Sequence, residues 1–151
     1  LGDVYKRQLM NCAADKHLQF DVEGLDDGAE APVEGVSRAA LLAILRNLLE
    51  NAFHYTPEGG AVTLRVARTS EKLVLSVADT GPGIAPEERS RVFDPFYRVT
   101  GSGLPGTGLG LAIVKTYADM TGADVTLSDT VPGGTPPGLT ATVSCPLPPA
   151  G

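Results

Sequence analysis

The chain has 151 residues, of which 42% are hydrophobic and 20% charged, a balance that indicates one globular domain and excludes a disordered chain. A net charge of −6 argues against nucleic acid as a partner, and no apolar run reaches the roughly 18 residues of a membrane-spanning helix. The unusual counts are 18 glycines and 12 prolines, which indicate either loose linkers or loops whose backbone lies close to a ligand.

Alternating apolar residues predict strands along the chain, and apolar residues at helical spacing predict helices. Ser37 is a suitable N-cap for the first long helix, Pro57 stops it, and Gly122 closes the second. In chain order we expect a strand at 17–22, a helix at 38–55, an antiparallel hairpin of strands at 61–68 and 72–79, a short helix at 86–92, a helix at 110–122, and strands at 123–129 and 138–147. The predicted fold class is α/β: a two-layer sandwich whose mixed, mainly antiparallel sheet packs against about three helices.

The domain itself is expected over residues 9–148, with residues 1–8 as non-native or linker residues and 149–151 as a tail. The chain begins with Leu1 rather than Met, which indicates a piece of a longer protein.

Two asparagines on the first long helix are candidate ligands. Asn47 and Asn51 are four residues apart, so both amides lie on one face of that helix. They are either a solvated edge of the helix or oxygen ligands for a hard cation such as Mg²⁺, which also takes water and phosphate oxygens.

The glycines gather beside predicted strands and helices rather than in a linker. Asp79 ends a strand and is followed by Gly81 and Gly83, so it is either a turn-capping residue or an acceptor for the amine of a bound ring. Gly108 and Gly110 stand at the entry to a helix, where free N–H groups favour an anion. A turn that merely allows close packing is the alternative there.

Four motifs follow one another in a fixed order: NLLENAFHYTP (47–57), DTGPG (79–83), FDPFYR (93–98) and GTGLGLAIVK (106–115). Together they resemble the N box, first glycine box, F box and second glycine box of the sensor histidine kinases, part of the ATP-binding family shared with DNA gyrase, Hsp90 and MutL. The resemblance covers residues 9–148. It implies the Bergerat α/β sandwich and an ATP-binding catalytic domain of a two-component sensor kinase.

The resemblance implies a role for each matched residue. Asn51 would coordinate the Mg²⁺ that bridges the ATP phosphates, with Asn47 assisting, while Tyr55 would stack on the adenine and Asp79 would accept its amine. His54 stands where the family often has Lys or Arg. It would either contact phosphate, with ATP binding strengthening as the imidazole gains a proton, or face solvent.

Phe93 and Phe96 would anchor an ATP lid, and Arg98 would reach the phosphates. The implied catalytic residues are Asn47, Asn51 and Arg98, and the implied metal ligands are Asn51 and Asn47. The implied nucleotide-binding residues are Asn51, His54, Tyr55, Asp79, Gly81, Gly83, Ile84, Phe96, Arg98, Gly106, Thr107, Gly108, Leu109, Gly110 and Leu111.

The implied function is a protein histidine kinase that moves the ATP γ-phosphate to a histidine on a separate dimerisation domain, expected upstream of Leu9. ATP-hydrolysing relatives place a Glu where Asn47 stands, and an amide cannot serve as that base. His17 does not match the phosphoacceptor pattern. The resemblance further implies a response regulator receiver domain as partner and a membrane-anchored homodimer whose catalytic domain is cytoplasmic.

Two alternatives stay open: an anti-sigma-type protein serine kinase, and a nucleotide-binding module without transfer activity. Three smaller expectations concern four further residues. Glu50 is expected to be a solvated charge, Lys115 to assist the phosphates, and Gly133 and Gly134 to form a turn.

Overall fold

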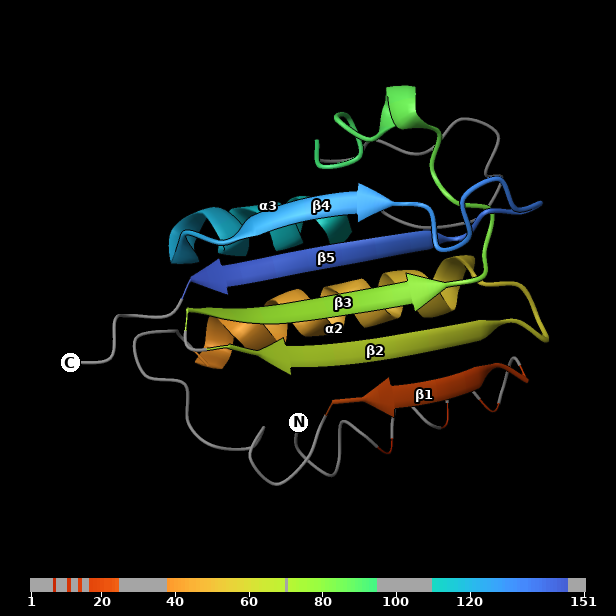
Figure 1. Ribbon diagram of the computed structural model, residues 1–151, viewed down its shortest axis with the longest axis horizontal. Coiled ribbons are helices and arrows are strands. Elements are labelled where there is room, and N and C mark those ends of the chain that lie inside the picture. The colour runs from red at the N-terminus through yellow and green to blue at the C-terminus, as the bar shows by residue number, and fades with distance from the viewer. Residues whose placement is uncertain are drawn as a thin grey trace.

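A five-stranded sheet with two α-helices on one of its faces forms the fold (Figure 1). The computed structural model describes residues 17–24, 38–69, 71–94 and 110–146, together with Arg7, Asn11 and Ala14. The strands are β1 (Gln19–Glu23), β2 (Ala61–Arg68), β3 (Lys72–Asp79), β4 (Asp124–Ser128) and β5 (Leu139–Pro146), and the helices are α2 (Arg38–Tyr55) and α3 (Gly110–Thr121).

The strand order across the sheet is β1-β2-β3-β5-β4. β1 pairs with β2 in parallel, and every other pairing is antiparallel. The predicted mixed, mainly antiparallel sheet and its hairpin of β2 and β3 are therefore confirmed. The last strand, β5, lies between β3 and β4, so β3 is the centre of the sheet.

The predicted helix at 86–92 is wrong. Only Pro86–Glu88 form a single turn of 3₁₀ helix, and turns follow as far as Phe93. Val92 is the one buried side chain of residues 86–92, so the segment has no apolar face to pack against the core. A short helix without a buried face is not stable in water. The described part of the chain thus has two α-helices rather than about three.

The core lies between the sheet and its two helices. α2 is rich in Ala and Leu, which favour helix, and it turns its apolar side toward β2 and β3, while α3 covers β4 and β5 (Figure 1). Phe20 of β1 meets Phe53 of α2 edge to face, with ring centroids 5.2 Å apart. The largest fully buried apolar side chains are Ile44, Leu49, Val62, Leu64, Val114 and Val143.

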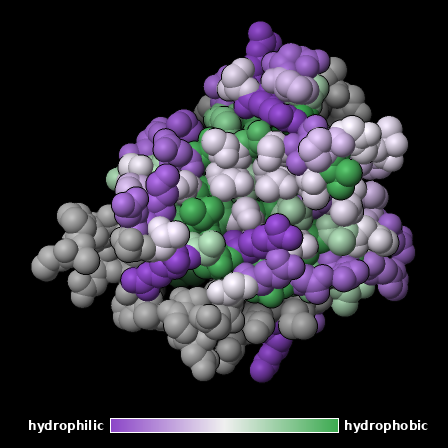
Figure 2. All heavy atoms as spheres, in the orientation of Figure 1, coloured by the Kyte–Doolittle hydropathy of each residue, from purple (hydrophilic) through white to green (hydrophobic). Residues whose placement is uncertain are grey.

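The opposite face of the sheet carries small side chains. Strand alternation places Thr63, Ser76 and Thr142 there, in the register in which Ser76 of β3 faces Thr142 of β5. Figure 2 looks onto this face, which is mostly pale and purple rather than green. None of the described helices is both long and apolar enough to span a membrane. Of the polar residues singled out from the sequence, Asp79 lies at the end of β3 and Tyr55 at the end of α2.

Candidate functional site

Asp79 is the last residue of the central strand β3, and its side chain is buried, with 5% exposed. Its Oδ1 accepts hydrogen bonds from the backbone N–H of Gly81 at 2.9 Å and of Leu139 at 3.2 Å. Burial raises the pKa of Asp79 above its usual value of 3.8, and the two backbone N–H donors lower it by less. Both bonds within the described chain end on Oδ1, so Oδ2 is the oxygen left to accept a bond from a ligand.

The two glycines after Asp79 lie against the protein's own backbone. A Cβ on Gly81 would come within 2.9 Å of the carbonyl oxygen of Tyr55, the last residue of α2. Gly83 has a φ of +77°, and its Cβ would lie 2.7 Å from the carbonyl oxygen of Gly138. The glycines therefore bring the end of α2 and the start of β5 close to Asp79. Their contact with a nucleotide stays a prediction.

One face of α2 leads to this point. Asn47, Asn51 and Tyr55 follow one another at four-residue spacing, and all three are half-buried. The Nδ2 of Asn47 donates to the Ala43 carbonyl at 2.7 Å, which fixes the amide and leaves its oxygen for another partner. The Tyr55 carbonyl lies beside Gly81, so the polar face of α2 ends close to the turn that follows Asp79. That this face and the buried carboxylate form one site stays a prediction.

The donor set of this site fits Mg²⁺ better than a softer metal. The described residues include no group of three or more His, Cys, Asp or Glu that could hold a metal ion. Two amide oxygens from Asn47 and Asn51 would leave most coordination positions to water and phosphate, which is the usual arrangement for Mg²⁺ in nucleotide sites.

The structure also gives the contacts of four charged or aromatic residues on α2 and α3. The rings of His54 and Tyr55 meet edge to face, with centroids 4.9 Å apart, and both side chains are half-buried. Glu50 is exposed and lies 3.6 Å from Arg46, which confirms a solvated charge. Lys115 forms an ion pair with Asp119 at 3.0 Å on α3, so its phosphate role stays a prediction.

Of the other predicted site residues, some lie in the core or beside it, one begins α3, and the rest lie outside the described chain. Ile84 and Leu111 belong to the hydrophobic core, Phe93 packs against it, and Gly110 is the first residue of α3. The predictions for Phe96, Arg98, Gly106, Thr107, Gly108 and Leu109 lie outside the described residues.

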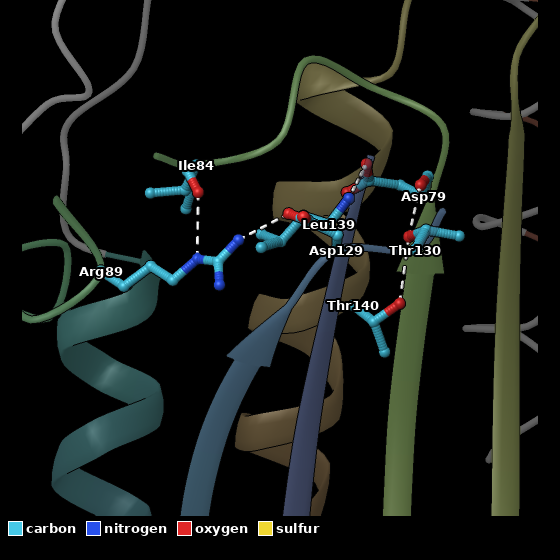
Figure 3. Close-up of polar contacts among 7 residues, drawn as sticks. All are labelled: Asp79, Ile84, Arg89, Asp129, Thr130, Leu139 and Thr140. Carbon is cyan, nitrogen blue, oxygen red and sulfur yellow. Dashed lines mark hydrogen bonds and ion pairs between the residues drawn. The ribbon is translucent and has the colours of Figure 1, made fainter. Parts of the chain in front are cut away.

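The connection between β4 and β5 holds residues that the sequence did not single out. Thr130 Oγ1 donates to the Asp79 carbonyl at 2.8 Å, and Thr140 Oγ1 lies 3.0 Å from Thr130 Oγ1 (Figure 3). Gly138 has a φ of +71°, and its Cβ would lie 2.2 Å from the Asp79 carbonyl oxygen. A glycine just before a strand was the available signal, and it does not reveal the partner.

The predicted turn in the same connection is confirmed. Gly134 N–H donates to the Val131 carbonyl at 2.9 Å, and Gly133 has a φ of +77°. Val131 N–H in turn donates to the Pro137 carbonyl at 2.9 Å, which closes the connection on itself.

Comparisons with known proteins identify the family of the chain. Residues 36–149 match the family described as histidine kinase-, DNA gyrase B-, and HSP90-like ATPase. The signal transduction histidine-protein kinase/phosphatase MprB of Mycobacterium ulcerans is 45% identical over 126 residues, which are 82% of this chain and 23% of that protein. The swarming motility regulation sensor protein RssA of Serratia marcescens is 41% identical over 113 residues, which are 74% of this chain and 24% of that protein.

Solved structures give the same result. The mycobacterial sensor histidine kinase MprB superposes with a TM-score of 0.76 and 29% identity, over 98% of this chain and 96% of that one. The nucleotide-free catalytic domain of histidine kinase ThkA has a TM-score of 0.76 at 24% identity, over 95% of this chain and 92% of that one, which supports the fold alone.

The chain spans about a quarter of the length of the curated relatives it matches. The family match includes α2 with its two asparagines, Asp79, and the connection that supports Asp79. The chain therefore belongs to the histidine kinase-, DNA gyrase B- and HSP90-like ATPase family, as a catalytic and ATP-binding domain of the histidine kinase type.

Proposed function

We propose that this domain binds ATP with Mg²⁺ and transfers the γ-phosphate to a histidine on a separate dimerisation domain of the same protein. The observation that carries the proposal is the buried carboxylate of Asp79 at the end of β3, with one oxygen held by two backbone N–H groups. A carboxylate in that state accepts hydrogen bonds and donates none. It suits the exocyclic amine of adenine and repels the carbonyl oxygen that guanine has in the same place.

The phosphates would lie toward the polar face of α2. Asn51, assisted by Asn47, would hold a Mg²⁺ that neutralises phosphate charge, and Tyr55 would stack on the adenine. His54, Arg98 and the glycines at 106, 108 and 110 would complete the contacts with the triphosphate. Phosphoryl transfer depends mainly on positioning and charge neutralisation, which are what these groups can supply.

Transfer to protein rather than to water is supported by the residue at position 47, which is an amide where the ATP-hydrolysing relatives place a carboxylate base. Asn47 is an amide, and its Nδ2 already donates to Ala43. Glu50 is exposed and lies close to Arg46, so it is not available to activate a water at the phosphates. An attacking histidine from another domain brings its own nucleophile.

In the whole protein, the phosphate would pass to a response regulator receiver domain. We place this domain in the cytoplasm as part of a membrane-anchored homodimer. The names of the relatives support this placement, because they describe a signal transduction kinase and a sensor protein. The serine kinase alternative is not favoured, since the named kinases are histidine kinases.

Phosphotransfer itself is tested by mixing the domain with a phosphoacceptor domain and labelled ATP. Acid-labile, base-stable label on the acceptor is the expected product, because phosphohistidine has that stability. Label that survives acid would identify a hydroxyl acceptor and contradict the proposal.

Asn51→Ala is expected to weaken ATP binding about 10- to 100-fold in the presence of Mg²⁺ because it removes a metal ligand. Titration with a fluorescent ATP analogue, with Mg²⁺ and again with a chelator, measures the effect. Glu50→Ala is the matched control on the same helix and should bind like the parent. Equal Mg²⁺ dependence in Asn51→Ala and the parent would contradict metal ligation by Asn51.

A further inference from the structure

The guanidinium of Arg89 joins two segments that meet beside Asp79 (Figure 3). Its Nε donates to the Ile84 carbonyl at 3.0 Å, and its Nη2 lies 2.6 Å from Asp129 Oδ1. The two side chains are 23% and 32% exposed, so the pair is partly shielded from solvent. Arg89 therefore ties the segment after the DTGPG motif to the first residue after β4.

Thr130 extends this connection to Asp79. Its hydroxyl has a single proton, which goes to the Asp79 carbonyl at 2.8 Å. The 3.0 Å contact with Thr140 must then be donated by Thr140 Oγ1, so β5 supports the same hydroxyl. At the other end of the β4–β5 connection, Leu139 N–H donates to Asp79 Oδ1 at 3.2 Å. The connection thus contacts both the main chain and the side chain of Asp79.

We propose that Arg89 and Asp129 are positioning residues for the nucleotide site. Their ion pair holds the β4–β5 connection against the end of β3. This fixes the position and orientation of the Asp79 carboxylate relative to the adenine base. Neither residue contacts the nucleotide in this proposal. It rests on the proposed function, because it takes the adenine amine as the ligand of Asp79.

A second ion pair on the same sheet offers a matched control. Arg65 and Glu23 also lie 2.6 Å apart, but their side chains are 66% and 54% exposed and join β2 to β1, away from Asp79. Losing that pair removes the same charges without touching the β4–β5 connection. Any effect found only for Arg89 and Asp129 therefore comes from their position.

The test is the dissociation constant of fluorescent ATP and GTP analogues for the whole chain and its variants, with the unfolding free energy measured in parallel. Arg89→Ala and Asp129→Ala are each expected to weaken ATP binding about 5- to 20-fold, and GTP binding by much less, so the preference for ATP falls. The double variant should bind ATP no more weakly than the single variant with the lower ATP affinity, because both residues act through one ion pair. Arg65→Ala and Glu23→Ala should bind like the parent.

The sign of the Asp129→Ala effect separates positioning from charge. Removing a carboxylate near an anionic ligand would strengthen binding if electrostatics alone acted, whereas loss of positioning weakens it. Should Arg89→Ala fail to fold, Arg89→Lys decides. It keeps the cation but replaces the planar fork, whose Nε and Nη2 bond Ile84 and Asp129 separately, with a single nitrogen, so it should also lose affinity for ATP.

ATP affinity within twofold of the parent in Asp129→Ala, a gain in that affinity, or equal losses for ATP and GTP would overturn the inference. A parent chain that binds no ATP, or an Asp79→Asn variant that binds as well as the parent, would contradict the proposed function instead.

Discussion

Asp79→Asn is expected to weaken ATP binding at least about 100-fold while leaving the fold as stable as before, or more stable, at neutral pH. The Asn oxygen can still accept from Gly81 and Leu139, whereas its Nδ2 would meet the adenine amine donor to donor. The same Nδ2 can donate to the carbonyl of guanine, so the preference for ATP over GTP should shrink or reverse. Fluorescent-nucleotide titration and chemical unfolding measure the two effects.

The stability of this variant should depend on pH in a defined direction. Burial raises the pKa of Asp79 above 3.8 in the folded state, so folding favours the protonated form. In the parent, the protonated Asp79 side chain contributes its full share to the free energy of unfolding below the usual pKa of the carboxyl. That contribution is lost as pH rises through the raised pKa of the folded state. Asparagine stays neutral, so the variant should gain stability relative to the parent as pH rises above the usual Asp pKa of about 4, until it passes the raised pKa of the folded state. If the difference in unfolding free energy between the variant and the parent stays constant or falls as pH rises, burial does not destabilise the charged carboxylate of Asp79.

Gly138→Ala is expected to destabilise the domain by about 3 kcal/mol or more. The left-handed φ of +71° is strained for alanine, and the new Cβ would lie 2.2 Å from the Asp79 carbonyl oxygen, which forces the backbone to move. Because Leu139 is the next residue, ATP binding should fall with stability. Urea unfolding gives the free energy, and nucleotide titration below the transition gives the binding loss.

Gly133→Ala provides the control for the backbone conformation alone. Gly133 has a φ of +77°, yet a Cβ there would meet nothing within 4 Å. Its substitution should destabilise by only about 1–2 kcal/mol and leave ATP affinity unchanged. If Gly138→Ala lowers the unfolding free energy no more than Gly133→Ala does, the close approach of residue 138 to the Asp79 carbonyl does not account for the destabilisation.

Local patterns predicted the elements well where burial follows the strand or helix period. β2 and β3 have the bounds expected from their alternating residues, and α2 ends at Tyr55 as Pro57 requires. The helix at 86–92 was wrong because Pro and charged residues that suit a first turn do not supply a buried face. Residues that suit the start of a helix do not show whether one of its faces will be buried against the rest of the protein.

Within the site, the sequence indicated the residues whose chemistry is visible in a short motif, such as Asn51 and Asp79. It missed Thr130, Gly138 and the pair of Arg89 with Asp129, whose partners lie 40 to 60 residues away. Alternation tells which face a residue occupies but not which strand lies beside it. β3 lies between β2, its hairpin partner, and β5, and only the assembled sheet reveals the second neighbour.

The place of β5 between β3 and β4 has a consequence for how the domain assembles. A chain without β5 could still pair β1 with β2 and β2 with β3, but β4 would have no partner strand within the described sheet. Such a chain would also lack the Leu139 N–H that donates to Asp79 Oδ1 and the Thr140 hydroxyl that contacts Thr130. A nascent chain released before β5 would hold both asparagines and Asp79 and still lack a formed adenine site. Nucleotide would then stabilise only the completed sheet, so its binding should protect the whole domain from unfolding rather than one local segment.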